Sequence, residues 1–455
     1  MKRATEGTEV TEIMMRLLIL VGVLIAASSA SAQPAVVRLS LADAIARGFE
    51  NSHRLAEARA REQGARAAAE SADLADKPTF NASAGYSRTN HVLNFGFPRP
   101  DGALVIVFPD IPDNFTSRLS FQWPIYTSGR SDALERAALA EAQAAGADIE
   151  TTRADLRLEI VRAYWAAVTA REAERVLEES TARAEAQVTD AKNRFDVGLI
   201  PPNEVSTLEA QRSRERAQLI EATNIREGAT IELRRLIGVP HETILELTDG
   251  LDASVAAPTA TGQVSDVVKQ ALEARSERKA LSLRLGGAEE RQKAALTTTK
   301  PTVAFAGGFD YAKPNRRIFP VTPTWDESWD LGVNVNWNFF DFGRAKSQAA
   351  EAAAIVAATR ERIAEFDSVV SADIRQRLLD IESSQAMVRA ASDAVRSAAE
   401  ARRVVMDRFG AGVATSTDVL IAQVQLLESE LVRTRALAGV RLAEARLERA
   451  LGRQP

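Results

Sequence analysis

Few residues of this chain have the types and spacing that catalysis or metal binding needs. It contains no cysteine, and its three histidines, His53, His91 and His241, lie far apart in the sequence. The lack of a thiol excludes a cysteine nucleophile, a zinc knuckle, an iron–sulfur cluster and a lipid-modified cysteine. Scattered histidines offer few candidates for a metal site or a catalytic triad. We therefore expect no catalytic residues, no metal and no cofactor, and predict that the chain is not an enzyme.

Two carboxylates do have a suggestive position, because each follows a glycine-containing break between long helical segments. Glu204 follows Gly198, and Asp418 follows Gly412. Glycine permits the backbone dihedral angles of a chain reversal, and a carboxylate at the start of the next helix is favourable for the helix dipole. The pattern predicts two tight reversals in which a capping role alone accounts for both acids.

Composition places the chain among folded proteins that do not bind nucleic acid. Hydrophobic residues make up 45% of its 455 residues and charged residues 26%, so it can bury a core. The net charge is only −5, and no cluster of Lys and Arg is dense enough to follow a phosphate backbone.

The N-terminal segment resembles an export signal. An apolar run over residues 17–27 precedes small residues that suit signal peptidase, which predicts a signal peptide over residues 1–32. The segment before the run carries three glutamates, so a start at Met14 or Met15 fits a positively charged beginning better. The run is shorter than the ~20 residues of a spanning helix, and no later stretch is apolar enough to span. If the protein enters a membrane, it must use strands.

The sequence contains an internal duplication. Three landmarks recur at one constant offset: Arg194–Gly198 with Arg408–Gly412, Gly129-Arg130 with Gly343-Arg344, and Leu236–Gly238 with Ala450–Gly452. Earlier landmarks recur at a larger offset, so the first copy has nine extra residues between Pro78 and Gly129. A constant offset across Gly, Pro and Arg is hard to obtain by accident. We assign a first repeat to 33–240, a linker to 241–263 and a second repeat to 264–455.

Each repeat is predicted to contain a helix, two strands, a long helix, a tight break and a helix. The predicted helices are 41–76, 130–195, 203–236, 265–299, 344–409 and 417–451. The segment 344–409 lacks Pro and holds about 100 Å of helix at ~1.5 Å per residue. Ile363, Phe366, Val370 and Ile374 step by three or four residues, which is typical of a coiled coil. An isolated coiled-coil hairpin is the alternative interpretation of the helices alone.

The strands favour a membrane barrel. Apolar and polar residues alternate over 79–87, 118–125 and 329–339, and most aromatic residues of the chain lie within 78–126 and 301–343. Aromatic residues near strand ends are typical of a bilayer interface, and ~9–11 residues suit a tilted spanning strand. Four strands cannot close a barrel. Two copies would give a filled eight-stranded barrel, whereas three give twelve strands and a lumen, so we predict a homotrimer.

The whole mature chain, from Leu39 to Gln454, resembles the TolC family of outer-membrane efflux proteins. The doubled plan and the two break motifs, over 194–205 and 408–419, carry the resemblance. It implies an α+β membrane fold, in which a trimeric 12-stranded β-barrel, four strands per chain, continues into a long α-helical coiled-coil barrel. The implied location is the outer membrane of a Gram-negative bacterium, in contact with its lipid and with the tunnel in the periplasm.

The resemblance also implies roles for the residues of the two breaks. Gly198, Leu199, Gly412 and Val413 correspond to the periplasmic tips, where an adaptor protein docks. Glu204 and Asp418 correspond to acids that line the periplasmic entrance, which is an alternative to capping alone. Phe409 and Ala414 stand where the best-known member has the tyrosine and arginine that help to lock its closed state. We therefore expect different contacts in the closed state.

The function implied is passive export through a channel that an inner-membrane pump energises. The partners would be a periplasmic adaptor, also called a membrane fusion protein, and a transporter of the RND, ABC or MFS class. The alternative function is that of a periplasmic coiled-coil adaptor or structural protein. The sequence identifies neither the transported substrate nor the pump.

Overall fold

The computed structural model describes residues 36–252 and 263–453, so the predicted signal peptide and part of the predicted linker lie outside the described residues. The chain divides into two compact units. The described parts of the first unit are 36–52, 157–252 and 382–443, and those of the second are 53–156, 263–381 and 444–453. No helix among the described residues is both long and apolar enough to cross a membrane.

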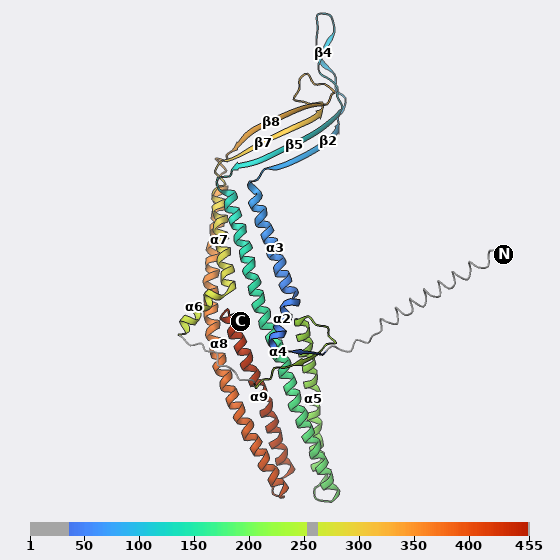
Figure 1. Ribbon diagram of the computed structural model, residues 1–455, viewed down its shortest axis with the longest axis vertical. Helices are drawn as coiled ribbons and strands as arrows, with labels where there is room; N and C mark the ends of the chain where they lie inside the picture. Colours follow the sequence, from blue (N-terminus) through green and yellow to red (C-terminus); the bar gives the residue numbers. More distant parts are fainter. Residues whose placement is uncertain (1–35, 253–262, 454–455) are drawn as a thin grey trace, which may run out of the picture. The chain divides into compact units, whose positions relative to one another are not determined.

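The element order repeats the predicted plan (Figure 1). The first repeat contains β1 (Val36–Leu39), α2 (Leu41–Asn51), α3 (His53–Asp73), the 3₁₀ turn η1 (Leu74–Asp76), β2 (Thr79–Arg88), β3 (Phe95–Pro98), β4 (Leu104–Phe108), β5 (Asp113–Tyr126), α4 (Arg130–Asp196) and α5 (Pro202–Ile237). The strand β6 (Ile244–Leu247) follows. The second repeat contains α6 (Val264–Ala274), α7 (Ser276–Leu296), β7 (Thr302–Lys313), β8 (Asp326–Asn336), α8 (Arg344–Gly410) and α9 (Ser416–Ala450).

The backbone repeats together with the sequence. Ser128 and Gly129, which lie between β5 and α4, have φ values of 57° and 79°. Phe342 and Gly343, at the equivalent place between β8 and α8, have φ values of 54° and 88°. A positive φ is uncommon for residues other than glycine. Its recurrence at matching positions of the two repeats supports the duplication.

The first helix of each repeat was predicted as one piece, and this prediction is wrong. The chain breaks at Ser52, between α2 and α3, and at Arg275, between α6 and α7. The Asn51 side chain donates to the Ile237 carbonyl (3.0 Å), and the Arg275 Nε donates to the Ala450 carbonyl (3.0 Å). In both repeats the last helix therefore ends against the break in the first helix. This tertiary contact overrides the local helix propensity of the sequence.

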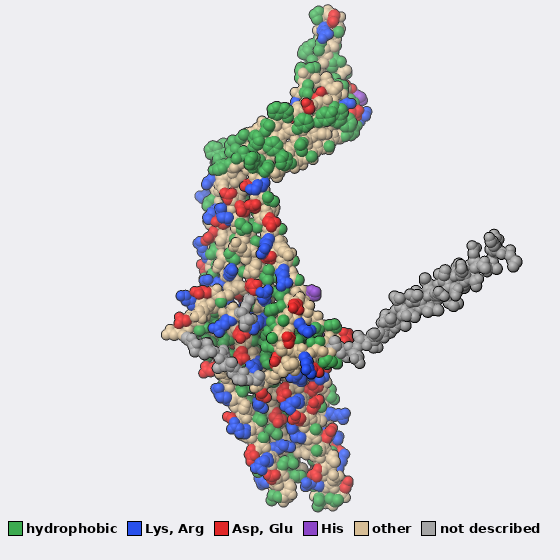
Figure 2. All heavy atoms as spheres, in the orientation of Figure 1, with side chains coloured by type: hydrophobic (Ala, Val, Ile, Leu, Met, Phe, Trp, Pro, Cys, Tyr) green, Lys and Arg blue, Asp and Glu red, His purple; other side chains and the backbone are tan. Residues whose placement is uncertain are grey.

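The second unit contains a four-stranded antiparallel sheet in the order β2-β5-β7-β8 (Figure 1). One face is apolar and exposed: Trp329, Leu331, Val333 and Val335 of β8 are each more than half exposed. Figure 2 shows hydrophobic side chains gathered over this sheet, whereas charged side chains are spread over the helices. The predicted alternation of the strands is confirmed, although β8 ends at Asn336, earlier than predicted.

Two smaller sheets were not predicted. β1 pairs in parallel with β6, Val36 with Ile244, so a strand lies in the segment predicted to be a linker. β3 and β4 form a hairpin within the first repeat's extra residues, and its apolar run Leu104–Phe108 lacks the alternation that would have indicated a strand.

In the first unit, α4 pairs with α5 and α8 with α9 (Figure 1). Val188, Ala191 and Leu208 form one buried cluster between α4 and α5. In the second unit, Val370 and Ile374 of α8 are buried, which confirms part of the predicted coiled-coil spacing. The long helices α4 and α8 each end at one of the two turns that hold the predicted site residues.

Candidate functional site

Both helix reversals have the same backbone geometry. In the first turn, residues 194–205, the N–H of Leu199 donates to the Arg194 carbonyl and that of Gly198 to the Phe195 carbonyl, both at 2.8 Å. In the second turn, residues 408–419, the equivalent bonds run from Val413 to Arg408 (2.9 Å) and from Gly412 to Phe409 (3.0 Å). This pair of bonds is a Schellman motif, which ends a helix on a left-handed residue.

The glycines are required by the dihedral angle. Gly198 has a φ of 74° and Gly412 a φ of 76°, whereas a Cβ added at either position would meet nothing within 4 Å. An L-residue with a side chain is strained at such an angle even where space is free. The tight reversal predicted at each glycine is confirmed, and both glycines adopt a positive φ.

The tips of both turns expose apolar side chains. Leu199 is 72% exposed and Val413 is 66% exposed, and each immediately follows its glycine. A hydrophobic residue at this place in a Schellman motif commonly packs against the end of its own helix. The large exposure shows that neither side chain is covered in this way.

Asp418 caps its own helix. Its carboxylate accepts from the backbone N–H and the hydroxyl of Thr415, both at 2.8 Å, and the Asp418 N–H donates to the Thr415 hydroxyl at 3.2 Å. This reciprocal arrangement is a capping box. The backbone and hydroxyl hydrogen bonds from Thr415 hold the pKa of Asp418 below its usual value. The structure therefore provides the capping role, and a role of this exposed acid at an entrance stays a prediction.

Glu204 lies at the equivalent place but makes a different contact. Its carboxylate accepts a hydrogen bond from the hydroxyl of Ser416, which belongs to the second turn and is buried. The N-cap residue of α5 is Pro201, and it makes no side-chain cap. Glu204 thus connects the two turns, whereas Asp418 stays within its own.

Phe409 also connects the two turns. The guanidinium carbon of Arg194 lies 4.7 Å from the centre of the Phe409 ring, close enough for a cation–π interaction. Arg194 also donates from Nε to Asp190 (2.8 Å). Glu204 and Phe409 line one cavity between the α4–α5 and α8–α9 hairpins, and Asp418 does not.

Ser416 and Arg194 had not been singled out by the sequence analysis, although both lie within the break motifs. The charge pattern along the helices could not identify their contacts between the turns, because Ser416 bonds to Glu204 and Arg194 lies over Phe409, each in the other repeat. The only sequence signal for either residue was its place within a break motif.

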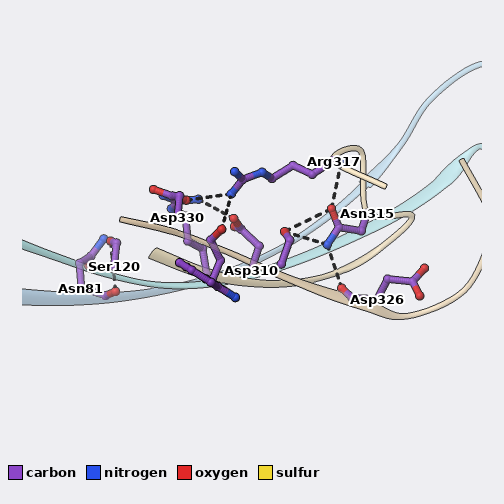
Figure 3. A network of polar contacts seen from close by, with 10 residues as sticks. Asn81, Ser120, Asp310, Asn315, Arg317, Asp326 and Asp330 are labelled. Carbon is purple, nitrogen blue, oxygen red and sulfur yellow. Dashed lines mark hydrogen bonds and ion pairs between the residues drawn. The ribbon is translucent and has the colours of Figure 1, made fainter. Parts of the chain in front are cut away.

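A second polar site lies on the sheet of the second unit (Figure 3). Arg118 of β5 donates from Nη1 to Asp310 of β7 (2.6 Å) and from Nη2 to Asp330 of β8 (3.1 Å). Arg317, in the loop after β7, donates to the same Asp330 at 3.1 Å. These charged groups therefore satisfy one another on the face of the sheet opposite Trp329.

Glycine in β7 makes the reach of Arg118 possible. A Cβ added at Gly308, whose register partner on β8 is Asp330, would collide with the guanidinium group of Arg118. The arginine can therefore lie across β7 and join three strands. Since Arg118 is paired twice and Arg317 once, the polar face carries a network in which both arginines have acidic partners.

Comparison with known proteins covers almost the whole chain. The family model described as outer membrane efflux protein matches residues 45–239 and 267–453, one segment within each repeat. The outer membrane protein TolC of Vibrio cholerae is 25% identical over 435 residues, which are 94% of this chain and 94% of TolC.

Solved structures share the fold. The outer membrane protein VceC of Vibrio cholerae superposes with a TM-score of 0.73 at 20% identity, over 90% of this chain and 96% of VceC. The CmeC outer membrane channel of Campylobacter jejuni gives 0.76 at 17%, over 90% of this chain and 85% of CmeC. The open state of the MtrE outer membrane channel of Neisseria gonorrhoeae gives 0.75 at 20%, over 90% and 88%.

Proposed function

The chain belongs to the outer membrane efflux protein family, and we propose that three copies form the exit duct of a tripartite efflux or type I secretion system. As a member of this family it is an outer-membrane channel, with its helical tunnel in the periplasm of a Gram-negative bacterium.

The observation that carries the proposal is the four-stranded sheet with two open edges. β2 and β8 pair with only one strand each among the described residues, and one face of the sheet exposes large apolar side chains. In hydrocarbon each unpaired backbone group costs several kcal/mol, so the edges must find partners. Pairing β8 of one copy with β2 of the next, three times over, closes a 12-stranded barrel around a lumen.

Disulfide trapping tests this closure, because the chain has no natural cysteine. Each of three variants carries two cysteines. One replaces Ser83 on β2, and the other replaces Gly332, Asn334 or Asn336 on β8. Oxidation is expected to give covalent dimers and trimers for at least one register. The control pairs Ser120 of β5 with Asn334, which β7 separates, and no bond should form. Monomers from all three test pairs would contradict the proposed closure.

We propose that a periplasmic adaptor docks on the tips of both turns and links the channel to an inner-membrane transporter of the RND, ABC or MFS class. The exposed Leu199 and Val413 support this, because apolar side chains at the end of a long hairpin bury little of their surface within their own chain. We also propose that transport through the channel is passive and that the chain has no enzymatic activity.

Charge at the tips tests the docking. Leu199→Asp and Val413→Asp are expected to preserve the heat-modifiable trimer in outer-membrane fractions and to lower efflux, measured as substrate retained by cells. Thr207→Asp, at an exposed position of the same first hairpin, is the control and should leave efflux unchanged. Normal efflux in both tip variants would show that the adaptor does not use these side chains.

Bilayer recordings test whether Asp418 also lines the entrance. In a trimer, Asp418→Ala removes three carboxylates, and a weaker cation preference and a weaker block by multivalent cations are expected. Thr415→Ala, which removes the hydroxyl half of the capping box and keeps the acid, is the control. Unchanged conductance, selectivity and block in Asp418→Ala would leave Asp418 as a helix cap only.

A further inference from the structure

A cavity of about 340 Å³ lies between the α4–α5 and α8–α9 hairpins, beside the two turns. All its lining residues belong to the first unit. Its volume is in the range of cavities that bind small molecules. The side chains that give the cavity its chemical character are Arg183, Arg194, Glu204, Arg402, Met406 and Phe409.

The lining contains more positive than negative side chains. Asp190 is paired with Arg194, and Glu204 accepts from Ser416, so both acids already have partners. Arg183 lies 3.5 Å from Glu430, which does not line the cavity. The positive charge that is left over is that of Arg402.

Arg402 has no ion pair with any residue in 36–252 or 263–453. The Nε–H groups of Arg402 and Arg183 are both buried and have no hydrogen-bond acceptor among those residues. A buried donor without an acceptor costs about 1–3 kcal/mol, more when the group is charged. Both of these donors belong to arginines that line the same cavity, one from each hairpin.

The electrostatics agree with this geometry. Burial and the like charge of Arg183 lower the pKa of Arg402, although Glu430 acts in the opposite direction. A bound anion would offset both effects, since it would pair with the two guanidinium groups and reduce their repulsion.

The other part of the cavity is apolar. Met406 and Phe409 follow Arg402 on α8 at spacings of four and seven residues, so all three share one face of the helix. Seven residues correspond to about 10 Å along the axis. A ligand that reached from Arg402 to Phe409 would therefore carry its charge at one end and an apolar or aromatic body at the other.

We propose that this cavity binds an amphiphilic organic anion, whose acidic group pairs with Arg402 and Arg183 and whose apolar body lies against Phe409. Because α4 and α8 supply the two arginines, the bound anion bridges the two hairpins of one chain. The proposal concerns a site within one chain and does not depend on the trimer or on an adaptor.

Three probes with the same body and different charge test the site. Naphthalene sulfonate, naphthylmethanol and naphthylmethylammonium are dialysed to equilibrium against the full-length protein in lipid nanodiscs, with empty nanodiscs as the blank for partition into lipid. The sulfonate is expected to bind at least tenfold more tightly than the alcohol, and the ammonium more weakly than both. Equal affinities for the three probes would overturn the proposal.

Neighbouring arginines of α8 provide a matched pair of variants. Arg402→Gln should weaken sulfonate binding about tenfold and leave the alcohol unchanged. Arg403→Gln should leave all three probes unchanged, because Arg403 is exposed, is paired with Glu400 (2.7 Å) and Asp407 (2.9 Å), and does not line the cavity. Equal losses of sulfonate affinity in the two variants would show only a general effect of surface charge and would contradict the site. Phe409→Ala should weaken all three probes.

Discussion

The first and second turns have the same backbone and different caps. Both end a long helix with a Schellman motif on a left-handed glycine, Gly198 or Gly412. After this point they differ: α9 begins with a capping box between Thr415 and Asp418, whereas α5 begins after Pro201 without a side-chain cap. The acid of the first turn, Glu204, reaches the other turn instead.

The difference shows which part of the turn can vary between the two copies and which part cannot. A left-handed dihedral angle excludes most residue types, so the glycine was kept in both copies. The unpaired N–H groups at a helix start can be satisfied in several ways. Thr415 accepts one of them in α9, whereas Pro202, at the first position of α5, has no N–H to satisfy. Glu204 has no N-cap hydroxyl partner in its own turn. Its carboxylate instead accepts a hydrogen bond from Ser416 of the second repeat.

The largest effect is expected at the shared feature. Gly198→Val and Gly412→Val each place a β-branched residue at a positive φ, which should cost about 1–2 kcal/mol at the turn. We expect the trimer to assemble and export to fall by a similar amount in both variants. Heat-modifiable trimers on gels and substrate retention in cells measure the two outcomes. Loss of the trimer in Gly412→Val would make this glycine a folding residue and remove support for docking there.

Gly410 provides the control for this prediction. It is two residues before Gly412, is the last residue of α8, has no positive φ and would offer open space to a Cβ. Gly410→Ala should therefore stabilise the end of α8, by at most about 0.5–1 kcal/mol, whereas Gly412→Ala should destabilise the turn. If both substitutions shift thermal stability in the same direction, the dihedral angle is not the reason for the glycine at 412.

The next effect separates the two turns. Thr415→Ala removes the N-cap hydroxyl of α9 and should cost about 1 kcal/mol in the free energy of opening the second turn. Asn203→Ala, in the first turn of α5, should cost less, because the Asn203 side chain is not part of a cap. Amide hydrogen exchange at residues 413–420 and 199–206 measures both. Equal loss of protection in the two variants would show that the caps are not what distinguishes the turns.

A smaller effect is expected from the bond between the turns. A double-mutant cycle with Ser416→Ala and Glu204→Ala should give a coupling energy of roughly 0.5–1.5 kcal/mol, typical of one hydrogen bond. Thermal unfolding of the four proteins measures the coupling. The same cycle with Thr207→Ala in place of Ser416→Ala should show no coupling to Glu204. Additive effects for Ser416 and Glu204 would mean that the two turns are energetically independent.

The smallest effect concerns acid. The pKa of Asp418 is lowered in the folded protein, so its carboxylate stabilises the cap fully above its unfolded value near 3.8. This stabilisation is lost as the pH falls through the lower folded value. Hydrogen exchange at residues 413–420, corrected for its intrinsic pH dependence, should show no change in protection between pH 7 and 5 and a loss below about pH 4. The control, Asp418→Asn, should show no such loss. Acid sensitivity that persists in Asp418→Asn must come from another group.

The glycines and helices could be predicted from the sequence because their causes are local. A glycine between two helical patterns sets the turn at Gly198 by itself, and the spacing of Val370 and Ile374 sets the buried face of α8. Alternation over β8 likewise indicated its exposed apolar face.

The features that escaped prediction depend on partners distant in sequence. The break at Ser52 arises where Asn51 meets the end of α5, and the surrounding sequence favours a helix. The strand β1 exists only because it pairs with β6, and its 4 residues are too short for a period. In the candidate site, Arg402 resembles any other charge along α8, and only its position opposite Arg183 distinguishes it.

The pairing of Val36 with Ile244 brings the start of the first repeat beside the segment that directly follows its end. A module whose ends are neighbours can be copied head to tail without being unwound, because the second copy starts where the first one stops. The pairing also offers an explanation of how a short connection could join two repeats that each carry a helical hairpin and a pair of strands. For an engineer, the same closeness makes the first repeat a natural place to cut the chain and rejoin it in a different order.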